Sequence, residues 1–337
     1  MKTKRKIDIA IGAVILIIIS MIGFFISNIY QEERLELPQE NYASDNFELY
    51  FTPSQNSIGR YLEAIGSSEK EIHCSLRSLN FPSLEDIFIS KESEGVKVRI
   101  YVDSDYKGNK RIYLPFVRFA PEGYSMMHNN YCILDDEIVI TGSTIFNQNT
   151  IEYALHDFVI INNEKLAERY NSDFWRLYNN QSVEKDFEEK EFIEINNELE
   201  VSSYFCPHED CEGTIVKLIE DSEKSVEFAV YSFTNEKIIQ AVKEAQTRGV
   251  KIKGVVEKQG VTKGSIIYEN IQNVKEDEFN RRVHTKIFVI DDEISVSGAM
   301  NPTYKGAHVN DENIIIIRNN EVNNLYTNYI DYVYNYK

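Results

Sequence analysis

The sequence predicts an α/β protein made of two similar halves and preceded by one transmembrane helix. Three observations support this prediction: one pattern occurs twice, strand-like and helix-like segments alternate within each copy, and a long uncharged stretch lies near the N-terminus. Strands that are separated by a helix are expected to be parallel neighbours in a layered domain.

The N-terminal segment combines a basic tip with an apolar stretch. Four Lys and Arg residues precede residues 9–29, which carry no charge over 21 residues. As a helix this stretch would span roughly 30 Å, about the hydrocarbon thickness of a bilayer. A signal peptide usually has a shorter apolar region and a small-residue cleavage site, and no Ala-x-Ala pattern follows here.

We therefore expect residues 1–30 to be a cytoplasmic tip and an uncleaved signal anchor. Basic residues favour the cytoplasmic side of a membrane. This predicts a single-pass protein of the cell membrane, with a linker at residues 31–45 and the remainder outside the cytoplasm.

An internal repeat organises the rest of the chain. The recurring landmarks, each given with its copy, are Ser68 and Ser222, Gly95 and Gly249, His128 and His284, and Gly142 and Gly298. The first two pairs are 154 residues apart and the last two are 156 apart. Such a constant interval indicates a duplicated fold. We expect one half at residues 46–181 and the other at 201–337.

Within the second half, residues 226–233 have the composition of a strand, residues 235–248 have helical spacing that ends at Gly249, and residues 250–256 suit a second buried strand. Residues 182–200 are rich in Glu and Asn and poor in large apolar clusters. They are therefore predicted to be an acidic connection between the halves.

The second half contains a motif suited to phosphodiester chemistry. His284 and Lys286 face the same way on a strand, because side chains alternate. Asp291 and Asn301 complete the patterns H-x-K-x4-D and G-x-x-N. An imidazole can attack phosphorus or donate a proton, and an ammonium can neutralise a phosphoryl oxygen. These patterns resemble those of the phospholipase D superfamily.

The first half carries an eroded copy of the motif. His128 and Asp135 keep the spacing, but Asn130 replaces the lysine and Ile145 replaces the asparagine. Asn130 can still donate a hydrogen bond to phosphate, without the added strength of a charge. We expect Asn130 and Ser143 to bind the substrate phosphate from this side.

The resemblance implies a bilobal unit in which two phospholipase D-like halves, each a mixed sheet flanked by helices, share one pseudo-symmetric site. It also implies a two-step reaction: one histidine forms a phosphohistidine, and the other protonates the leaving alcohol and then activates water or an alcohol. Neither a metal nor an organic cofactor is implied, and no oligomer is required, because both motifs are in one chain.

The resemblance also suggests the role of each site residue. Glu312 lies 28 residues after His284 and matches the carboxylate that orients the nucleophile, whereas His156 occupies that position after His128. We expect His284 to be the nucleophile and His128 the general acid and base. Other members with two motifs are described with these two roles reversed.

The remaining motif residues are expected to bind phosphate or to hold structure. Lys286 and Asn301 are predicted to hold the phosphoryl oxygens. Asp291 and Asp135 are predicted to support the fold rather than to contact substrate.

The substrate is less well determined. A net charge of −18 makes the chain a poor general binder of nucleic acid. This acidity and the predicted anchor favour a phospholipid. An exported endonuclease of the same superfamily is the alternative, and a degenerate protein that binds a phosphate ligand or a partner without turnover is a third possibility.

Four cysteines suit an exported protein. Cys206 and Cys211 flank a short turn-like segment, which favours a local disulfide. A Cys-x-His-x-x-Cys metal site is the alternative, although it lacks an evident fourth ligand. Cys74 and Cys132, both in apolar strand contexts, could be buried thiols or a second bridge.

Overall fold

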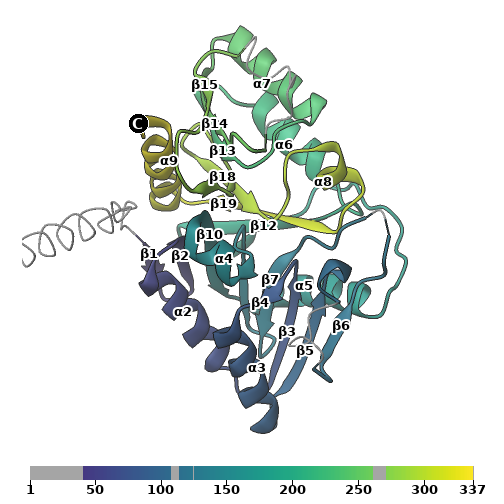
Figure 1. Ribbon diagram of the computed structural model, residues 1–337. Helices are drawn as coiled ribbons and strands as arrows, with labels where there is room; N and C mark the ends of the chain where they lie inside the picture. The colour runs from purple at the N-terminus through teal and green to yellow at the C-terminus, as the bar shows by residue number, and fades with distance from the viewer. Residues whose placement is uncertain (1–40, 108–113, 124, 261–270, 337) are drawn as a thin grey trace, which may run out of the picture. The chain divides into compact units, whose positions relative to one another are not determined.

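A computed structural model describes residues 41–107, 114–123, 125–260 and 271–336, and Figure 1 shows the predicted repeat as two similar α/β halves. The predicted tip and anchor, residues 1–30, lie outside the described residues. Among the helices that are described, none is both long and apolar enough to cross a bilayer.

Each half is built on a sheet with the same strand order. From edge to edge the first sheet contains β1 (Tyr42–Ser44), β2 (Phe47–Thr52), β10 (Ala154–Asn162), β8 (Ile138–Gly142), β7 (Asn130–Leu134), β3 (Glu71–Leu76), β5 (Lys97–Val102) and β6 (Val117–Phe119). The second contains β11 (Ile193–Asn196), β12 (Leu199–Cys206), β19 (Glu312–Arg318), β18 (Ile294–Gly298), β17 (Lys286–Ile290), β13 (Ser225–Val230), β14 (Lys251–Val256) and β15 (Val274–Glu276). In both halves one central strand has a parallel and an antiparallel neighbour. The sheets are therefore mixed, as predicted.

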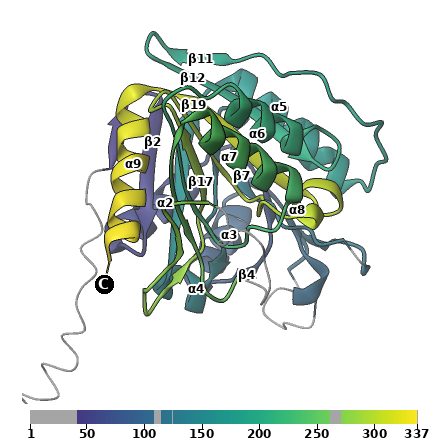
Figure 2. The same cartoon turned by 90° about the horizontal axis from the view of Figure 1, so that it is seen from above.

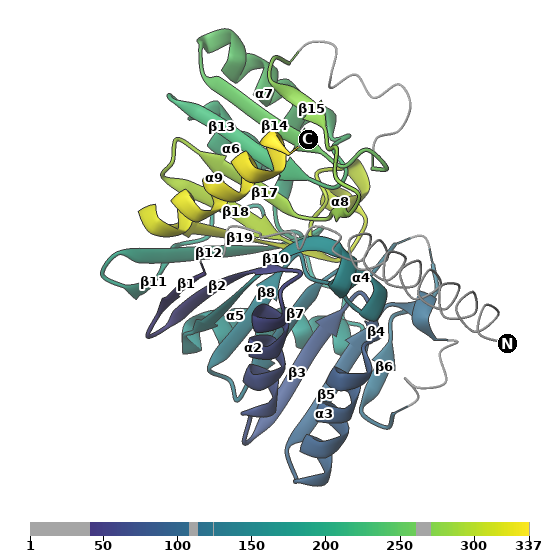
Figure 3. The same cartoon turned by 60° about the vertical axis from the view of Figure 1, so that its left-hand side comes forward.

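Helices cover both faces of each sheet (Figure 3). The first half has α2 (Gln55–Gly66), α3 (Pro82–Ser93), the short α4 (Gln148–Tyr153) and α5 (Glu164–Tyr178), and the second has α6 (Cys211–Glu220), α7 (Glu236–Arg248), the short α8 (Tyr304–His308) and α9 (Asn320–Asn335). Alternation along β3 separates the two faces: Ile72 lies in the apolar core beneath α2 and α3, whereas His73 stacks on Phe174 of α5 at 4.9 Å.

Equivalent local signals start and end these helices. The side chains of Asn163 and Asn319 accept hydrogen bonds from backbone N–H groups in the first turns of α5 and α9. Gly249 ends α7 with a φ of 96°, which confirms the predicted helix stop.

Each motif aspartate follows its strand and accepts hydrogen bonds from the backbone at the start of the neighbouring strand, β3 or β13. Asp135 accepts hydrogen bonds from the backbone N–H groups of residues 69–71, at 2.7 to 2.9 Å. Asp291 does the same for residues 223–225, at 2.6 to 2.8 Å. Neither carboxylate is free to contact a substrate.

Elements of each half pack against the other half. In Figure 2 helix α9 of the second half lies against strand β2 of the first, where Tyr329 and Phe51 stack with ring centroids 4.5 Å apart. On the other side, Tyr170 of α5 packs edge-on against Phe205 of β12 at 5.0 Å. Each half thus completes part of the core of the other.

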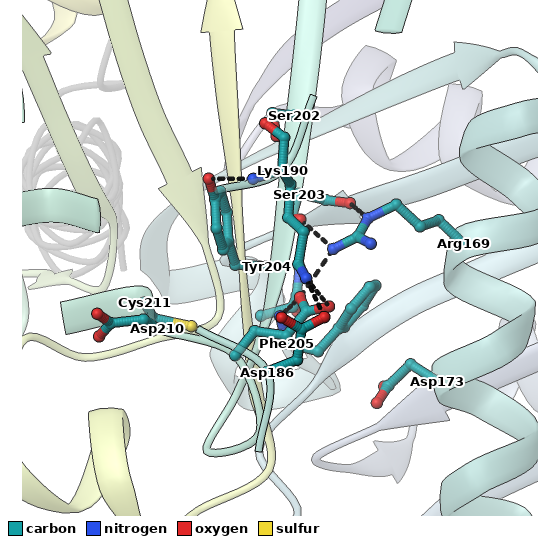
Figure 4. A network of polar contacts seen from close by, with 12 residues as sticks. Arg169, Asp173, Asp186, Lys190, Ser202, Ser203, Tyr204, Phe205, Asp210 and Cys211 are labelled. Carbon is teal, nitrogen blue, oxygen red and sulfur yellow. Dashed lines mark hydrogen bonds and ion pairs between the residues drawn. The ribbon is translucent and has the colours of Figure 1, made fainter. Parts of the chain in front are cut away.

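The connection is shorter than we predicted, because residues 193–200 belong to the second sheet: β11 pairs antiparallel with β12. The Glu-rich composition concealed this strand. Similarly, β1 lies inside the predicted linker. Figure 4 shows how the connection is fixed: the backbone N–H of Lys190 donates to the Tyr204 hydroxyl at 2.9 Å. Nearby, Arg169 of α5 donates to the Ser203 hydroxyl at 3.0 Å and joins α5 to β12.

All four cysteines form disulfides. The Cys206–Cys211 bond confirms the predicted local bridge and leaves no thiolate for the alternative metal site. Cys74 and Cys132 are directly opposite one another on β3 and β7 and form the second bond.

Candidate functional site

The two motif histidines precede equivalent strands, and each is tied to the opposite half. The backbone N–H of His128 donates to the carbonyl of Asp311 at 2.8 Å, and that of His284 donates to the carbonyl of Leu155 at 2.9 Å. The short strand β16 (Arg282–Val283), just before His284, also pairs with β10 of the first half. Both histidines are 6% exposed. The motif backbones are therefore placed by contacts between the halves.

Glu312 orients His128 rather than His284, which corrects our prediction. Its Oε2 lies 2.6 Å from His128 Nδ1, and its Oε1 accepts a hydrogen bond from Asn310 at 3.1 Å. Glu312 has no exposed surface. Because β19 runs past the first motif, the carboxylate meets the histidine that is distant in sequence. Its acceptance at Nδ1 leaves Nε2 of His128 free to react.

Aromatic rings and a lysine surround His284. The rings of His156 and Tyr231 each lie 4.8 Å from its ring, and Lys286 Nζ is 2.8 Å from Nδ1. Burial, and then the charge of Lys286, holds the pKa of His284 well below its usual range. His156 donates from Nδ1 to the Ser143 carbonyl at 2.8 Å, and burial lowers its pKa to about 3. A neutral ring therefore stands beside His284 where the other copy has the carboxylate of Glu312 beside His128.

Lys286 supplies the positive charge of the site. It is 3% exposed and also donates to the carbonyl of His284 at 2.6 Å. Burial lowers the pKa of Lys286 to about 7, and the carboxylates of Glu312 and Asp157 act against this fall. Such an ammonium sits at the balance between its charged and neutral forms near neutral pH.

Asn130 takes the structural contact of Lys286 but not its charge. Its amide donates to the His128 carbonyl at 3.2 Å and accepts from the backbone N–H of Arg77 at 3.3 Å. Both ends of this predicted phosphate ligand are thus engaged within the chain.

Ser143 is not a phosphate ligand in this arrangement, contrary to our prediction. It has no exposed surface, donates to a carboxylate oxygen of Asp157 at 2.5 Å and accepts from the backbone N–H of Asp157 at 2.9 Å. Asn301 differs, because it is only half-buried and its amide oxygen has no hydrogen-bond partner among the described residues. That oxygen is itself buried and can only accept a hydrogen bond, so a phosphoryl oxygen would be contacted by the amide N–H groups of the side chain.

Asp157 is a component of the site that the sequence did not reveal. It is fully buried and accepts hydrogen bonds from the hydroxyls of Ser143, Ser297 and Tyr326, the last at 2.9 Å. Burial raises the pKa of Asp157, and these three donors followed by Lys286 act against the rise. The available signal was the repeat itself, since Asn313 stands 156 residues later.

One group of potential metal ligands lies in the described part of the chain, beside Asp135 and at the end of β7 opposite to His128. Glu71, His73 and Asp136 bring their ligand atoms within 4.8 Å of one another. However, His73 Nδ1 is paired with Asn171 at 2.8 Å, and Arg99 lies 3.4 Å from Nε2. The cluster is satisfied by protein groups, so we assign it no metal.

A duplicated α/β unit in which two H-x-K-type motifs meet across the halves defines a phospholipase D-like protein. The chain matches the family described as "Cardiolipin synthase, PLD-like domain" over residues 61–178 and 215–334, and it belongs to this family within the phospholipase D superfamily. The resemblance inferred from the motifs is confirmed.

Named relatives cover only part of the chain. A phospholipase D of Rickettsia typhi is 31% identical over 126 residues, which span 36% of this chain and 62% of the relative. A mitochondrial cardiolipin hydrolase of Canis lupus familiaris is 22% identical over 130 residues, spanning 37% and 51% respectively. The structure of phosphatidylserine synthase from Haemophilus influenzae has a TM-score of 0.65 at 12% identity and covers 88% of this chain and 87% of its own, which supports the fold alone.

Proposed function

We propose that the chain is a phosphodiesterase that cleaves phospholipid phosphodiester bonds through a phosphohistidine intermediate. The observation that carries this proposal is the buried pair of His128 and Glu312, held at 2.6 Å across the halves beside the charge of Lys286. A carboxylate at Nδ1 fixes the tautomer and supports positive charge on the ring.

The geometry leads us to revise the roles of the histidines. His128, which has the orienting carboxylate, attacks phosphorus through Nε2, and the bond from phosphorus to the leaving alcohol breaks. His284 gives that oxygen a proton. In the second step His284 takes a proton from water, the water oxygen bonds to phosphorus, and the bond to His128 breaks. Lys286 and Asn301 contact the phosphoryl oxygens, and the negative charge of the bound phosphodiester raises the low pKa of His284.

The lipid assignment is supported by the relatives whose names specify a phospholipase D and a cardiolipin hydrolase. The acidity of the chain also disfavours a nucleic-acid backbone as substrate. Two disulfides suit an oxidising compartment. We propose accordingly that the described residues act outside the cytoplasm, anchored by residues 9–29.

The test uses the full chain in detergent micelles with three substrates: a phospholipid with a labelled headgroup, single-stranded DNA and double-stranded DNA. Lipid turnover that is lost in both His128→Ala and His284→Ala supports the proposal. The control is His208→Gln, a partly exposed histidine in the turn after β12, which should retain activity. Cleavage of DNA alone would identify a nuclease. Absence of turnover on all three substrates would favour the degenerate binding protein.

A further inference from the structure

A buried cluster of hydroxyl groups surrounds Asp157 where the two halves meet. Ser297 of β18 and Tyr326 of α9 come from the second half, whereas Ser143 comes from the first. All four side chains are buried. A carboxylate this deep in the protein is stable as an anion only if donors or a positive charge compensate for its lost hydration.

The same cluster exists a second time around an amide. Asn313 donates to the hydroxyl of Thr141 at 2.8 Å and lies 3.4 Å from that of Tyr170. These two hydroxyls precede those of Ser297 and Tyr326 by 156 residues, the interval of the repeat. Two of the three hydroxyls around Asp157 therefore have a counterpart around Asn313, whereas Ala299 stands in place of Ser143. The two copies also differ in the charge of the central residue.

The central residue of each cluster is charged where the corresponding motif residue is charged and neutral where that residue is neutral. Asp157 accompanies Lys286, and Asn313 occupies the corresponding place relative to Asn130. The backbone register places each central residue near its motif: Leu155 of β10 pairs in parallel with Val283 of β16, and Asp311 forms the equivalent parallel bridge with Met127. Asp157 and Lys286 follow the first of these pairs by two and three residues, and Asn313 and Asn130 follow the second in the same way. Burial raises the pKa of Asp157 and lowers that of Lys286, and each charge opposes this effect on the other. The charged pair is present in one place and replaced by two amides in the other.

We propose that Asp157 is the buried counter-ion of Lys286, a positioning residue that keeps the lysine protonated for the phosphoryl group without touching substrate itself. The inference rests on the proposed function for its catalytic consequence, but the ionic coupling can be measured without turnover. The other titratable or charged groups around Lys286 are Glu312 from β19, His284 and Arg282 from the adjoining motif backbone, His128 from the first motif, His156 from β10 and Tyr231, whose ring centroid lies 5.8 Å from Nζ. Of the two carboxylates that act on Lys286, Glu312 belongs to the second half and Asp157 to the first.

The decisive experiment titrates Lys286 in the full chain by NMR, using lysine labelled with ¹³C at Cε. The signal is identified by its loss in Lys286→Met. In Asp157→Asn the pKa of Lys286 is expected to fall by about one unit, because one opposing charge is removed. The environment of Asn313 shows that an amide can be accommodated among these hydroxyls. An unchanged pKa in a folded variant would overturn the proposal.

A second variant keeps the test decisive if Asp157→Asn does not fold. Lys286→Met removes the positive charge and leaves the carboxylate in place, so the pKa of Asp157, followed by NMR of aspartate labelled with ¹³C at Cγ, should rise. A pKa of Asp157 that is identical in Lys286→Met and the unaltered chain would count against the proposal.

The converse experiment installs the charged pair in the eroded copy. Asn130→Lys alone buries a cation beside uncharged groups and should lower kcat/KM on bis(p-nitrophenyl) phosphate. Adding Asn313→Asp should recover much of this loss, although Asn313→Asp alone should be harmful. Effects of the two substitutions that simply multiply would exclude coupling. If the unaltered chain shows no turnover but the NMR coupling is found, the proposed function fails and the counter-ion assignment stands.

Discussion

Replacing Glu312 by Gln tests whether His128 depends on its carboxylate. The amide can still accept from Nδ1 of His128, so the substitution mainly removes charge from a fully buried contact of 2.6 Å. A hydrogen bond to a charged group contributes about 1.5–3 kcal/mol. If that contribution is lost as the ring becomes positively charged, kcat should fall about 10- to 150-fold, with little change in KM.

The assay follows p-nitrophenol release from bis(p-nitrophenyl) phosphate, and thermal unfolding verifies that the variant folds. Glu227→Gln is the matched control, because Glu227 pairs with Lys253 at 2.9 Å outside the motifs and should leave kcat unchanged. A fall smaller than about threefold in Glu312→Gln, or an equal fall in the control, would refute the role assigned to the carboxylate.

Four further predictions concern the acid, the lysine and the disulfides. In His284→Ala, p-nitrophenol should appear as a single burst and mass spectrometry should find a p-nitrophenyl phosphoryl group on His128, because this leaving group needs no proton whereas hydrolysis needs a base; a modified residue elsewhere would contradict the roles. Wild-type kcat/KM should fall as pH rises through about 7, when Lys286 loses its proton. The pKa of Lys286 is lowered from 10.5 to about 7, so between these pH values the unfolded chain binds more protons than the folded chain, and the free energy of unfolding should rise with pH. Denaturant titrations at several pH values measure this rise, which Lys286→Met should abolish. Replacing Cys74 and Cys132 by Ala should lower the unfolding free energy by about 4 kcal/mol, against about 2 kcal/mol for Cys206 and Cys211, because the first bridge joins residues 58 apart and the second residues 5 apart; equal losses in denaturant titrations would contradict this.

The repeat made much of the fold predictable, whereas the contacts between the halves could not be predicted from the sequence. The interval between copies predicted the equivalence of the halves, and the position of Asp135 after its strand predicted a structural role. The separation in sequence between Glu312 and each histidine could not predict which histidine the carboxylate contacts, because that contact depends on β19 passing the opposite motif. The role of Ser143 was wrong for a related reason: its hydroxyl is used by Asp157, a partner that the motif does not specify.

The crossed backbone hydrogen bonds of His128 and His284 have an evolutionary consequence. Each half supplies the backbone carbonyl that holds the motif histidine of the other half. Deletion of either half after the duplication would therefore have removed a contact that the remaining half needs. The shared requirement concerns main-chain position, not side-chain identity. Selection could therefore relax on the lysine and the asparagine of one copy while its strands were retained. A chain with one altered motif can thus be a stable evolutionary product in which the two copies have different roles.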